Sequence, residues 1–595
     1  MDEFEAMTRG LRPAGDNVMP RRRFVQQLAS AGLAPPLLAA LLAPVGPARA
    51  QAVPFTYRPT RRGGGGLLRI LAWQGATMLN PHLSGGSKDI LASRLFLEPL
   101  AQWDREGRLQ PILAAEIPSL ANGGVARDGM SVTWKLKRGV RWHDGQPFDA
   151  DDVVFTWEFA RHPETGAFTA GSFAPITVRK LDSHTVRIEF AQPTPEWADA
   201  FVGGAVLPRR HFAAYVGAKA REAPANLRPV GTGPYRIADF KPGDLVRGEP
   251  NPDYHLPNRP HFDGVEIKGG GDAVSAARAV LQTGDFDFAW NVQVEDEILQ
   301  RIERGGRGRV DFAPGGDIEY LMLNHADPWT ERNGERAHPD SRHPFLLDPA
   351  VRQALAHLVD RDSIQRYVYG RLGVATGNFL NNPARYQSSR VGARFDVARA
   401  NALLDAGGWV RAGDGVRAQG GRRLKMLFQT TTSAPRQKVQ TIIKQAAAQA
   451  GIEIDLKAVA PAVFFSSDVA NPDTNGKFLA DLQMYAVTRG GPEPGRFMEL
   501  YCSWLAASKA NGWLGRNATR YRNDEYDRTF RAAEQELDPA KRAALLMRLN
   551  DIVCDDHAVV PIAYRPKTNA IANSLQAPVS GWSVETAFIH DWYRT

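Results

Sequence analysis

The chain has 595 residues, enough for about four domain-sized units, so a single small module is excluded. Hydrophobic residues make up 43% and charged residues 23%, as in ordinary globular proteins, which excludes wholesale disorder. The formal charge of +8 is spread without a basic block, so we expect no nucleic-acid partner. Cys502 and Cys554 are the whole cysteine content; the sequence leaves open whether they form a disulfide or stay two buried thiols.

The N-terminal fifty residues are interpreted as a targeting signal. Arg21 and Arg22 precede the mildly apolar stretch 28–45, as in twin-arginine signals, and an A-x-A cleavage site follows at 48–50. We therefore expect a twin-arginine signal peptide at 1–50 and export to the periplasm. No lipid anchor is expected, because no cysteine follows the cleavage site. Residues 51–66 end in four glycines and predict a flexible leader.

Alternating and helical patterns are interspersed through the remaining chain. Strands are predicted at 67–73, 132–137, 186–190 and 235–240, and a helix at 90–96. Capping acids at Asp149, Asp348, Asp396 and Asp538 predict four further helix starts, the first with Asp152 as a capping box. This mixture predicts α/β layers rather than a helical bundle.

Motifs of covalent chemistry are missing from the sequence. It has no nucleophile elbow, no H-E-x-x-H, no C-x-x-C and no phosphate-binding Walker loop. His143 beside Asp144 is the most enzyme-like pair, but a histidine and a carboxylate in one glycine turn commonly form a solvated hydrogen-bonded pair. We therefore expect no enzyme, no cofactor and no metal site.

The segments 137–148 and 151–157 resemble the signature region of extracellular solute-binding proteins of family 5, the oligopeptide and dipeptide type that serves bacterial ABC importers. The resemblance continues through 231–235, 251–254, 284–287, 348–355 and 560–564. Each match is weak alone, but their order spans nearly all of residues 67–595.

The resemblance implies a two-lobed α/β periplasmic-binding-protein fold of class C, similar to type II, with an extra inserted subdomain. Lobe I is expected at 67–101, 208–322 and 566–595, the inserted subdomain at 102–207, and lobe II at 323–565. Such proteins bind a solute between two lobes that close on it, so binding shifts an existing equilibrium.

The implied function is the periplasmic solute-binding component of an ABC importer, which captures a peptide or peptide-like solute and delivers it to the permease. The expected partners are that small solute and the permease subunits, and the expected state is a monomer. Two alternatives stay open: a binder of a non-peptide solute such as a saccharide or an opine, and an exported hydrolase.

Ligand-facing positions follow from the resemblance. They are Trp290, Asn291, Tyr485, Thr488 and Tyr564, with Trp73 and Gln74 at the end of the first strand as further candidates. For Trp290 and Tyr485 the alternative is packing in the core.

The sequence departs from the peptide-binding pattern at Thr488. Peptide binders of this type carry an aspartate there that pairs with the ligand ammonium, whereas this chain has Thr488 followed by Arg489. We therefore expect a ligand that lacks a free N-terminal ammonium, or one with anionic or hydroxyl groups that Arg489 could bind. If the match is shifted by a few residues, Glu493 supplies the charge instead.

Overall fold

The first predicted strand lies in the middle of a large sheet. In the computed structural model, which describes residues 55–466 and 468–595, β1 (Leu67–Ala72) buries alternate side chains and pairs in parallel with β9 (Gly264–Gly269) and β10 (Phe288–Ala289). This confirms the strand predicted at 67–73. The predicted signal peptide at 1–50 lies outside the described residues.

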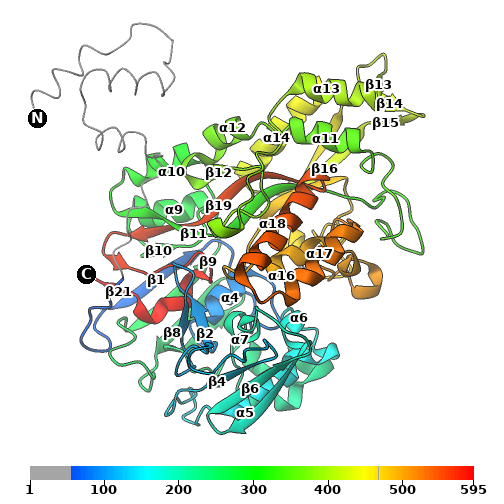
Figure 1. The fold of residues 1–595 in the computed structure, drawn as a ribbon. Coiled ribbons are helices and arrows are strands. Elements are labelled where there is room, and N and C mark those ends of the chain that lie inside the picture. The colour runs from blue at the N-terminus through cyan, green and yellow to red at the C-terminus, as the bar shows by residue number, and fades with distance from the viewer. Residues whose placement is uncertain (1–54, 467) are drawn as a thin grey trace, which may run out of the picture. The chain divides into compact units, whose positions relative to one another are not determined.

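Eleven strands form this sheet, and their order is β17-β16-β18-β11-β19-β10-β1-β9-β8-β7, with β12 on β19 (Figure 1). The other members are β7 (Tyr235–Lys241), β8 (Leu245–Pro250), β11 (Gly308–Leu323), β12 (Val374–Ala375), β16 (Lys425–Thr431), β17 (Glu453–Val459), β18 (Leu482–Val487) and β19 (Val559–Ala572). The strands at the two ends of this order belong to the predicted lobes I and II, and one hydrogen-bonded sheet therefore passes through both.

The long antiparallel strands β11 and β19 form the middle of that sheet. Their register shifts between Ala313 and Asp317, where β11 carries the sequence Pro314-Gly315-Gly316. A Cβ atom at Gly315 would lie 2.3 Å from the carbonyl oxygen of Gly581, so glycine is required there by close backbone approach. The pairing of β11 with β19 is therefore interrupted at 314–316, where Gly315 instead forms a bridge with Gly581.

The predicted inserted subdomain contains a small sheet of three strands in the order β4-β6-β5. The strands are β4 (Ser131–Lys135), β5 (Ile176–Asp182) and β6 (Thr185–Phe190), beside the β2 (Ala101–Trp103) and β3 (Leu109–Pro111) hairpin. Helix α5 (Ala150–Arg161) begins with Asp149 as N-cap and Asp152 as its capping-box partner, as predicted.

The remaining helices cover the sheets. They are α4 (Ser87–Ser93), α6 (Ala170–Phe173), α7 (Asp199–Gly203), α8 (Arg209–Phe212), α9 (Ala273–Leu281), α10 (Asp296–Glu303), α11 (Pro349–His357), α12 (Arg361–Ile364), α13 (Val397–Ala406), α14 (Ala434–Gln449), α15 (Pro461–Phe464), α16 (Gly495–Met498), α17 (Asp524–Gln535) and α18 (Pro539–Asp555). Asp348, Asp396 and Asp538 cap α11, α13 and α18, which confirms those starts. Helix α4 ends at Ser93, so the helix predicted at 90–96 starts and stops earlier.

Short strands complete the structure. The ribbon β13 (Val410–Arg411), β14 (Arg417–Gln419) and β15 (Arg422–Arg423) lies in the predicted lobe II, and β20 (Leu575–Gln576) pairs with β21 (Tyr593–Arg594) near the C-terminus. The described residues contain no helix long and apolar enough to cross a bilayer.

Buried apolar side chains gather in four clusters. One contains residues of 68–97 and 262–313 with the C-terminal segment, and a second contains residues of 100–206. The other two contain residues of 318–563 and lie on either side of β11 and β18. We keep the names lobe I, inserted subdomain and lobe II for the predicted ranges; their boundaries stay predictions.

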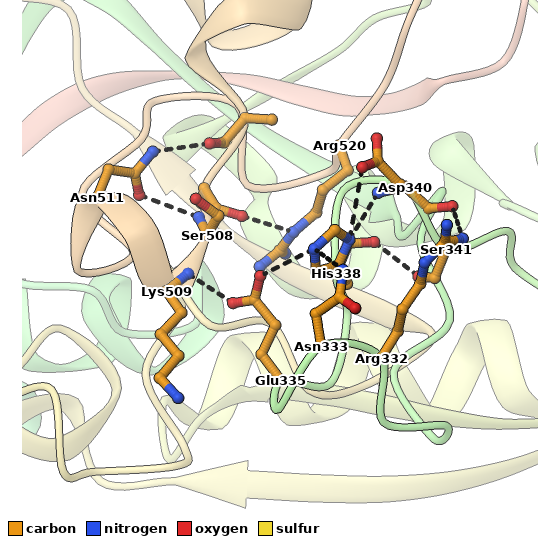
Figure 2. Close-up of polar contacts among 12 residues, drawn as sticks. Arg332, Asn333, Glu335, His338, Asp340, Ser341, Ser508, Lys509, Asn511 and Arg520 are labelled. Carbon is orange, nitrogen blue, oxygen red and sulfur yellow. Dashed lines mark hydrogen bonds and ion pairs between the residues drawn. The ribbon is translucent and has the colours of Figure 1, made fainter.

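A polar cluster in lobe II joins two loops that lie far apart in sequence (Figure 2). The carboxylate of Glu335 accepts a hydrogen bond of 2.5 Å from the backbone N–H of Lys509, and His338 lies 3.7 Å from the same side chain. Arg520, next to them in the figure, donates to the carbonyl oxygens of Ala507 and Lys477. The loop that follows β11 is thus fixed by hydrogen bonds rather than by secondary structure.

Both cysteines are buried and free in the apolar cluster that includes Tyr320 and Phe530. Burial raises the pKa of the Cys554 thiol to about 12, and it also raises the pKa of Cys502. Of the two arrangements left open by the sequence, the structure has two buried thiols.

Candidate functional site

Two tryptophans at the ends of neighbouring strands form the first group of predicted site residues. The rings of Trp73 and Trp290 stack with centroids 6.2 Å apart, and Trp73 Nε1 donates a hydrogen bond of 3.0 Å to the carbonyl oxygen of Asn291. Trp290 is buried in the lobe I core, while Trp73 is partly exposed. Asn291 has a positive φ of 53°, and its Oδ1 accepts from Gln293 Nε2 at 2.9 Å.

Gln74 follows directly and is partly exposed; its side chain makes no hydrogen bond within the described part of the chain. Trp73 and Gln74 therefore present one apolar and one polar surface to solvent at the end of β1. The ring of Trp290 is almost fully buried and stacks against Trp73, so it fixes the position of the partly exposed Trp73 ring.

A second group lies at the irregular part of β11. Thr488, exposed at the end of β18, donates through Oγ1 to Oδ2 of Asp317 at 3.3 Å. The other carboxylate oxygen of Asp317 is buried and has no hydrogen-bond partner. Tyr564 on β19 pairs with the next residue of β11, Ile318, and its hydroxyl accepts from Asn382 Nδ2 at 3.4 Å. Thr488 and Tyr564 are thus brought together around an acid that sequence reasoning missed.

Charge around Asp317 is mixed. Burial raises the pKa of Asp317 to about 6. Lys567, Arg565 and the backbone N–H of Arg489 act against burial, and Glu585 acts with it. Lys567 donates to the carbonyl oxygen of Ser583 and Arg565 is paired with Glu319, so both cations have other partners. A buried carboxylate oxygen without a partner costs free energy that a cationic or hydrogen-bonding group would recover.

Arg489 has a different position from the one expected for a ligand-facing arginine. Its side chain is buried, with Nε donating to the carbonyl oxygen of Gly491 at 3.0 Å and Nη2 donating to that of Asn382. The guanidinium also lies 5.0 Å from the ring centre of Trp582. Burial lowers the pKa of Arg489 to about 10. These contacts fix the loop after β18 against the C-terminal segment, and a contact with ligand stays a prediction.

Tyr485 lies apart from both groups. Its ring packs against Phe464 and Phe465, each at 5.7 Å between ring centres, and against Tyr320 at 6.3 Å. The side chain is partly buried at the edge of a lobe II cluster. The structure therefore brings Tyr485 into an aromatic group of lobe II rather than next to Thr488 or the tryptophans.

Glu493, the alternative source of negative charge, is already paired. Its carboxylate accepts from Arg385 at 2.6 Å, from the Tyr386 hydroxyl at 2.7 Å and from Arg542 at 2.5 Å. Arg542 also pairs with Glu196 of the inserted subdomain at 2.5 Å. Glu493 thus belongs to an ion-pair network between the inserted subdomain and lobe II, which leaves Asp317 as the unpaired acid near Thr488.

Some signal for Asp317 was present in the sequence. Pro314-Gly315-Gly316 interrupts an apolar run, and such an interruption inside a strand marks a bulge or a close backbone approach, where functional residues concentrate. Asn382 and Trp582 carried no comparable signal, because their contacts join distant segments.

Residues for covalent or metal chemistry do not gather here. Within the described residues no group of three or more His, Cys, Asp or Glu side chains could hold a metal ion. His143 Nε2 donates a hydrogen bond of 3.0 Å to the carbonyl oxygen of Gly233, whereas Asp144 pairs with Arg210 and His211. The expected local pair of His143 and Asp144 is therefore not formed; each residue has a separate structural partner.

A family model described as bacterial extracellular solute-binding proteins, family 5, middle part, matches residues 109–508. The chain belongs to this family. The family 5 proteins bind solutes, and membership confirms that this chain is a solute-binding protein and not an enzyme. The resemblance inferred from the sequence is confirmed with it.

Known relatives and structures agree with that membership. A Brucella ovis protein provisionally named an ABC transporter peptide-binding protein is 26% identical over 471 residues, which cover 78% of this chain and 80% of that protein. The glutathione-binding protein of Shigella boydii is 22% identical over 529 residues, 86% of this chain and 92% of that protein. The structure of the oligopeptide-binding protein AppA from Bacillus subtilis, in complex with a nonapeptide, has a TM-score of 0.75 and 21% identity, covering 90% of this chain and all of that one. This confirms the predicted two-lobed fold class.

Proposed function

We propose that this family 5 protein is the periplasmic component of an ABC importer and that it captures a peptide or peptide-like solute between its lobes. The names of the Brucella, Shigella and Bacillus proteins support a peptide-like solute. The observation that carries the proposal is the unpaired oxygen of Asp317, which lies beside Thr488 where the two lobes share their sheet. Permease subunits are the proposed partners.

The proposed solute carries an ammonium or guanidinium group. The position of Thr488 lacks the acid found in related peptide binders, but Asp317 lies 3.3 Å from it and offers a carboxylate from the neighbouring strand. A ligand cation there would form a charge-assisted hydrogen bond and remove the cost of a buried unpaired oxygen. This proposal differs from the expectation of a ligand that lacks a free N-terminal ammonium or carries anionic or hydroxyl groups near Arg489, which stays a prediction. The partly exposed Trp73 supplies an apolar surface.

The proposed movement is rotation of the lobes about β11 and β19. Rotation requires a few residues that absorb backbone change, and 314–316 are unpaired with β19 and contain two glycines. Arg542 and Lys438 supply contacts of the closed state, because they pair with Glu196 and Glu295 across the predicted boundary.

The first experiment identifies the solute. Ligand released from denatured protein is named by mass spectrometry, and its binding to stripped protein is measured by calorimetry. We expect a compound with a cationic nitrogen, and we expect that the protein binds and releases it without chemical change. Turnover of that compound, or a purely anionic solute, would contradict the proposal.

The second experiment tests Asp317 with matched substitutions. Asp317→Asn removes the charge and keeps the shape, and should weaken binding of the cationic solute by about 2 kcal/mol or more. Acetylation of the solute nitrogen should weaken binding to the parent but hardly to Asp317→Asn. The control is Asp455→Asn, an exposed acid on β17 whose partner is Lys425 at 3.3 Å, and it should bind like the parent. Equal effects of acetylation on parent and Asp317→Asn would contradict the role of Asp317.

Export by the twin-arginine route is also proposed, from the sequence at Arg21-Arg22 alone. Replacing both arginines by lysine should leave precursor in the cytoplasm, as measured by fractionation and immunoblotting. Normal processing of that variant would point to another route.

A further inference from the structure

A cavity lies away from the residues discussed above. It has a volume of about 490 Å³ and lies where the end of β4, the turn between β5 and β6, and the loop before β9 meet. It thus falls between the inserted subdomain and lobe I. None of its lining residues belongs to the proposed solute site.

The ionisable residues that line the cavity are all basic. Lys135, Lys137, Arg138, His184 and His255 line it, and none of the lining residues is an acid. Lys135 is paired with Glu116 at 2.8 Å outside that lining. Lys137 and Arg138 make no side-chain hydrogen bond or ion pair with any residue that the structure describes. Two cations are therefore available to a bound molecule.

Lys137 is the more informative of the two, since its side chain is only partly exposed. Burial lowers its pKa, and the charge of Glu98 acts in the opposite direction. A partly buried ammonium without a partner is costly, and an anion in the cavity would compensate it. Arg138 is exposed and can contribute a planar fork of donors that fits carboxylate and phosphate oxygens.

His255 gives an independent indication of a ligand. Its side chain is only 5% exposed, and Nε2 lies 3.0 Å from Oε2 of Glu98. The second ring nitrogen, Nδ1, is buried and has no hydrogen-bond partner. Glu98 is fully engaged, because it also accepts from the Tyr254 hydroxyl at 2.7 Å and from Thr232 at 2.9 Å. One buried polar atom in the wall of a cationic cavity is thus left for a ligand.

We propose that this cavity is a binding site for a small molecule that bears a phosphate or carboxylate group. Lys137 and Arg138 bind the oxyanion, and His255 donates to it through Nδ1 as an imidazolium, because Nε2–H already donates to Glu98. The cavity volume is that of a small-molecule site. The proposal does not depend on the function proposed above, since the two sites share no residue.

The test uses the intact protein and two oxyanions, inorganic phosphate and citrate, titrated separately by calorimetry at low ionic strength. We expect saturable binding of at least one. Saturation by phosphate alone assigns a phosphate-bearing ligand, saturation by citrate alone assigns a carboxylate ligand, and saturation by both assigns a general oxyanion site. Failure of both anions to saturate at about 10 mM would overturn the proposal.

A matched pair of double variants separates the site from general surface charge. Lys137→Met with Arg138→Gln should weaken binding about tenfold or more. The control is Arg179→Gln with Lys180→Met on β5 of the same subdomain, where the two cations are paired with Glu189 and Asp151, each at 2.8 Å; it should bind within about twofold of the parent. Equal losses in the two variants would overturn the proposal, because they would indicate unspecific attraction.

His255→Gln tests the buried nitrogen without removing a lysine or arginine. It should also weaken anion binding. Arg138→Gln alone, at an exposed position, provides a variant that does not depend on correct packing of Lys137. If both single variants bind like the parent, the assignment is wrong.

Discussion

Asp317 combines two properties that are rarely found together in a stable protein. One oxygen is buried without a partner, and the carboxyl lies beside cations that are already engaged elsewhere. A folded protein retains such a group at a cost, and costs of this kind concentrate at functional positions. The pKa of about 6 means that the carboxyl is largely ionised at neutral pH, when a cationic solute would need it.

The first prediction concerns Asp317 and pH. Since the folded-state pKa is raised to about 6 from an ordinary value near 3.8, the group favours folding most below pH 3.8 and loses that contribution as pH rises to 6. Asp317→Asn should therefore make the solute-free protein more stable at pH 7, by about 1 to 3 kcal/mol, and this gain should shrink at pH 4. Urea unfolding at both pH values measures it.

Asp455→Asn serves as the control for that comparison, because its carboxyl is exposed. It should show no comparable change between the two pH values. A destabilised Asp317→Asn at pH 7 would mean that the carboxylate has a favourable partner after all.

At the scale of elements, the sequence predicted what local interactions determine. The capping acid of α5 and its partner Asp152 are three residues apart, so their pattern is visible without a fold. Asp317 and Thr488 are 171 residues apart and meet only because β11 pairs with β18. Likewise the contacts of Tyr485 with Phe464 and Phe465 are not visible from any local pattern, and its predicted contact with a ligand stays a prediction.

The second prediction concerns the irregular part of β11. A Cβ atom at Gly315 would approach the Gly581 carbonyl oxygen to 2.3 Å, so Gly315→Ala should push the strand from the C-terminal segment and cost about 1 to 3 kcal/mol of stability. Thermal unfolding measures the loss. Gly413→Ala is the control, since no atom lies within 4 Å of its added Cβ, and it should change stability by less than about 0.5 kcal/mol. If Gly315→Ala and Gly413→Ala changed stability equally, β11 would be able to move away from the C-terminal segment at no cost.

At the scale of the whole molecule, contacts across the predicted boundaries determine how far the lobes separate. Arg542 of α18 is buried and holds Glu196 of the inserted subdomain together with Glu493 of lobe II. Arg548, one turn and a half further along the same helix, pairs with Glu525 of α17 inside lobe II and is about half exposed. Arg542 therefore makes contacts between the inserted subdomain and lobe II, whereas Arg548 makes a contact within lobe II only.

The third prediction uses this pair. Arg542→Met leaves two carboxylates without their shared partner, so it should destabilise the closed arrangement and increase the radius of gyration of the solute-free protein. The loss of stability should be about 3 to 5 kcal/mol, and small-angle scattering should show the expansion. Arg548→Met should cost at most about 1 kcal/mol and leave the radius unchanged. An unchanged radius in Arg542→Met would mean that other contacts keep the lobes together.

The two free cysteines can report on opening of the protein without an added label. Cys502 and Cys554 lie in one apolar cluster of lobe II, where burial keeps both thiols protonated and away from reagents. The rate at which a thiol reagent labels them is therefore limited by how often that cluster opens, and not by the reactivity of sulfur. Opening of lobe II can thus be timed in the natural chain, with no label introduced, while solute binding is followed separately.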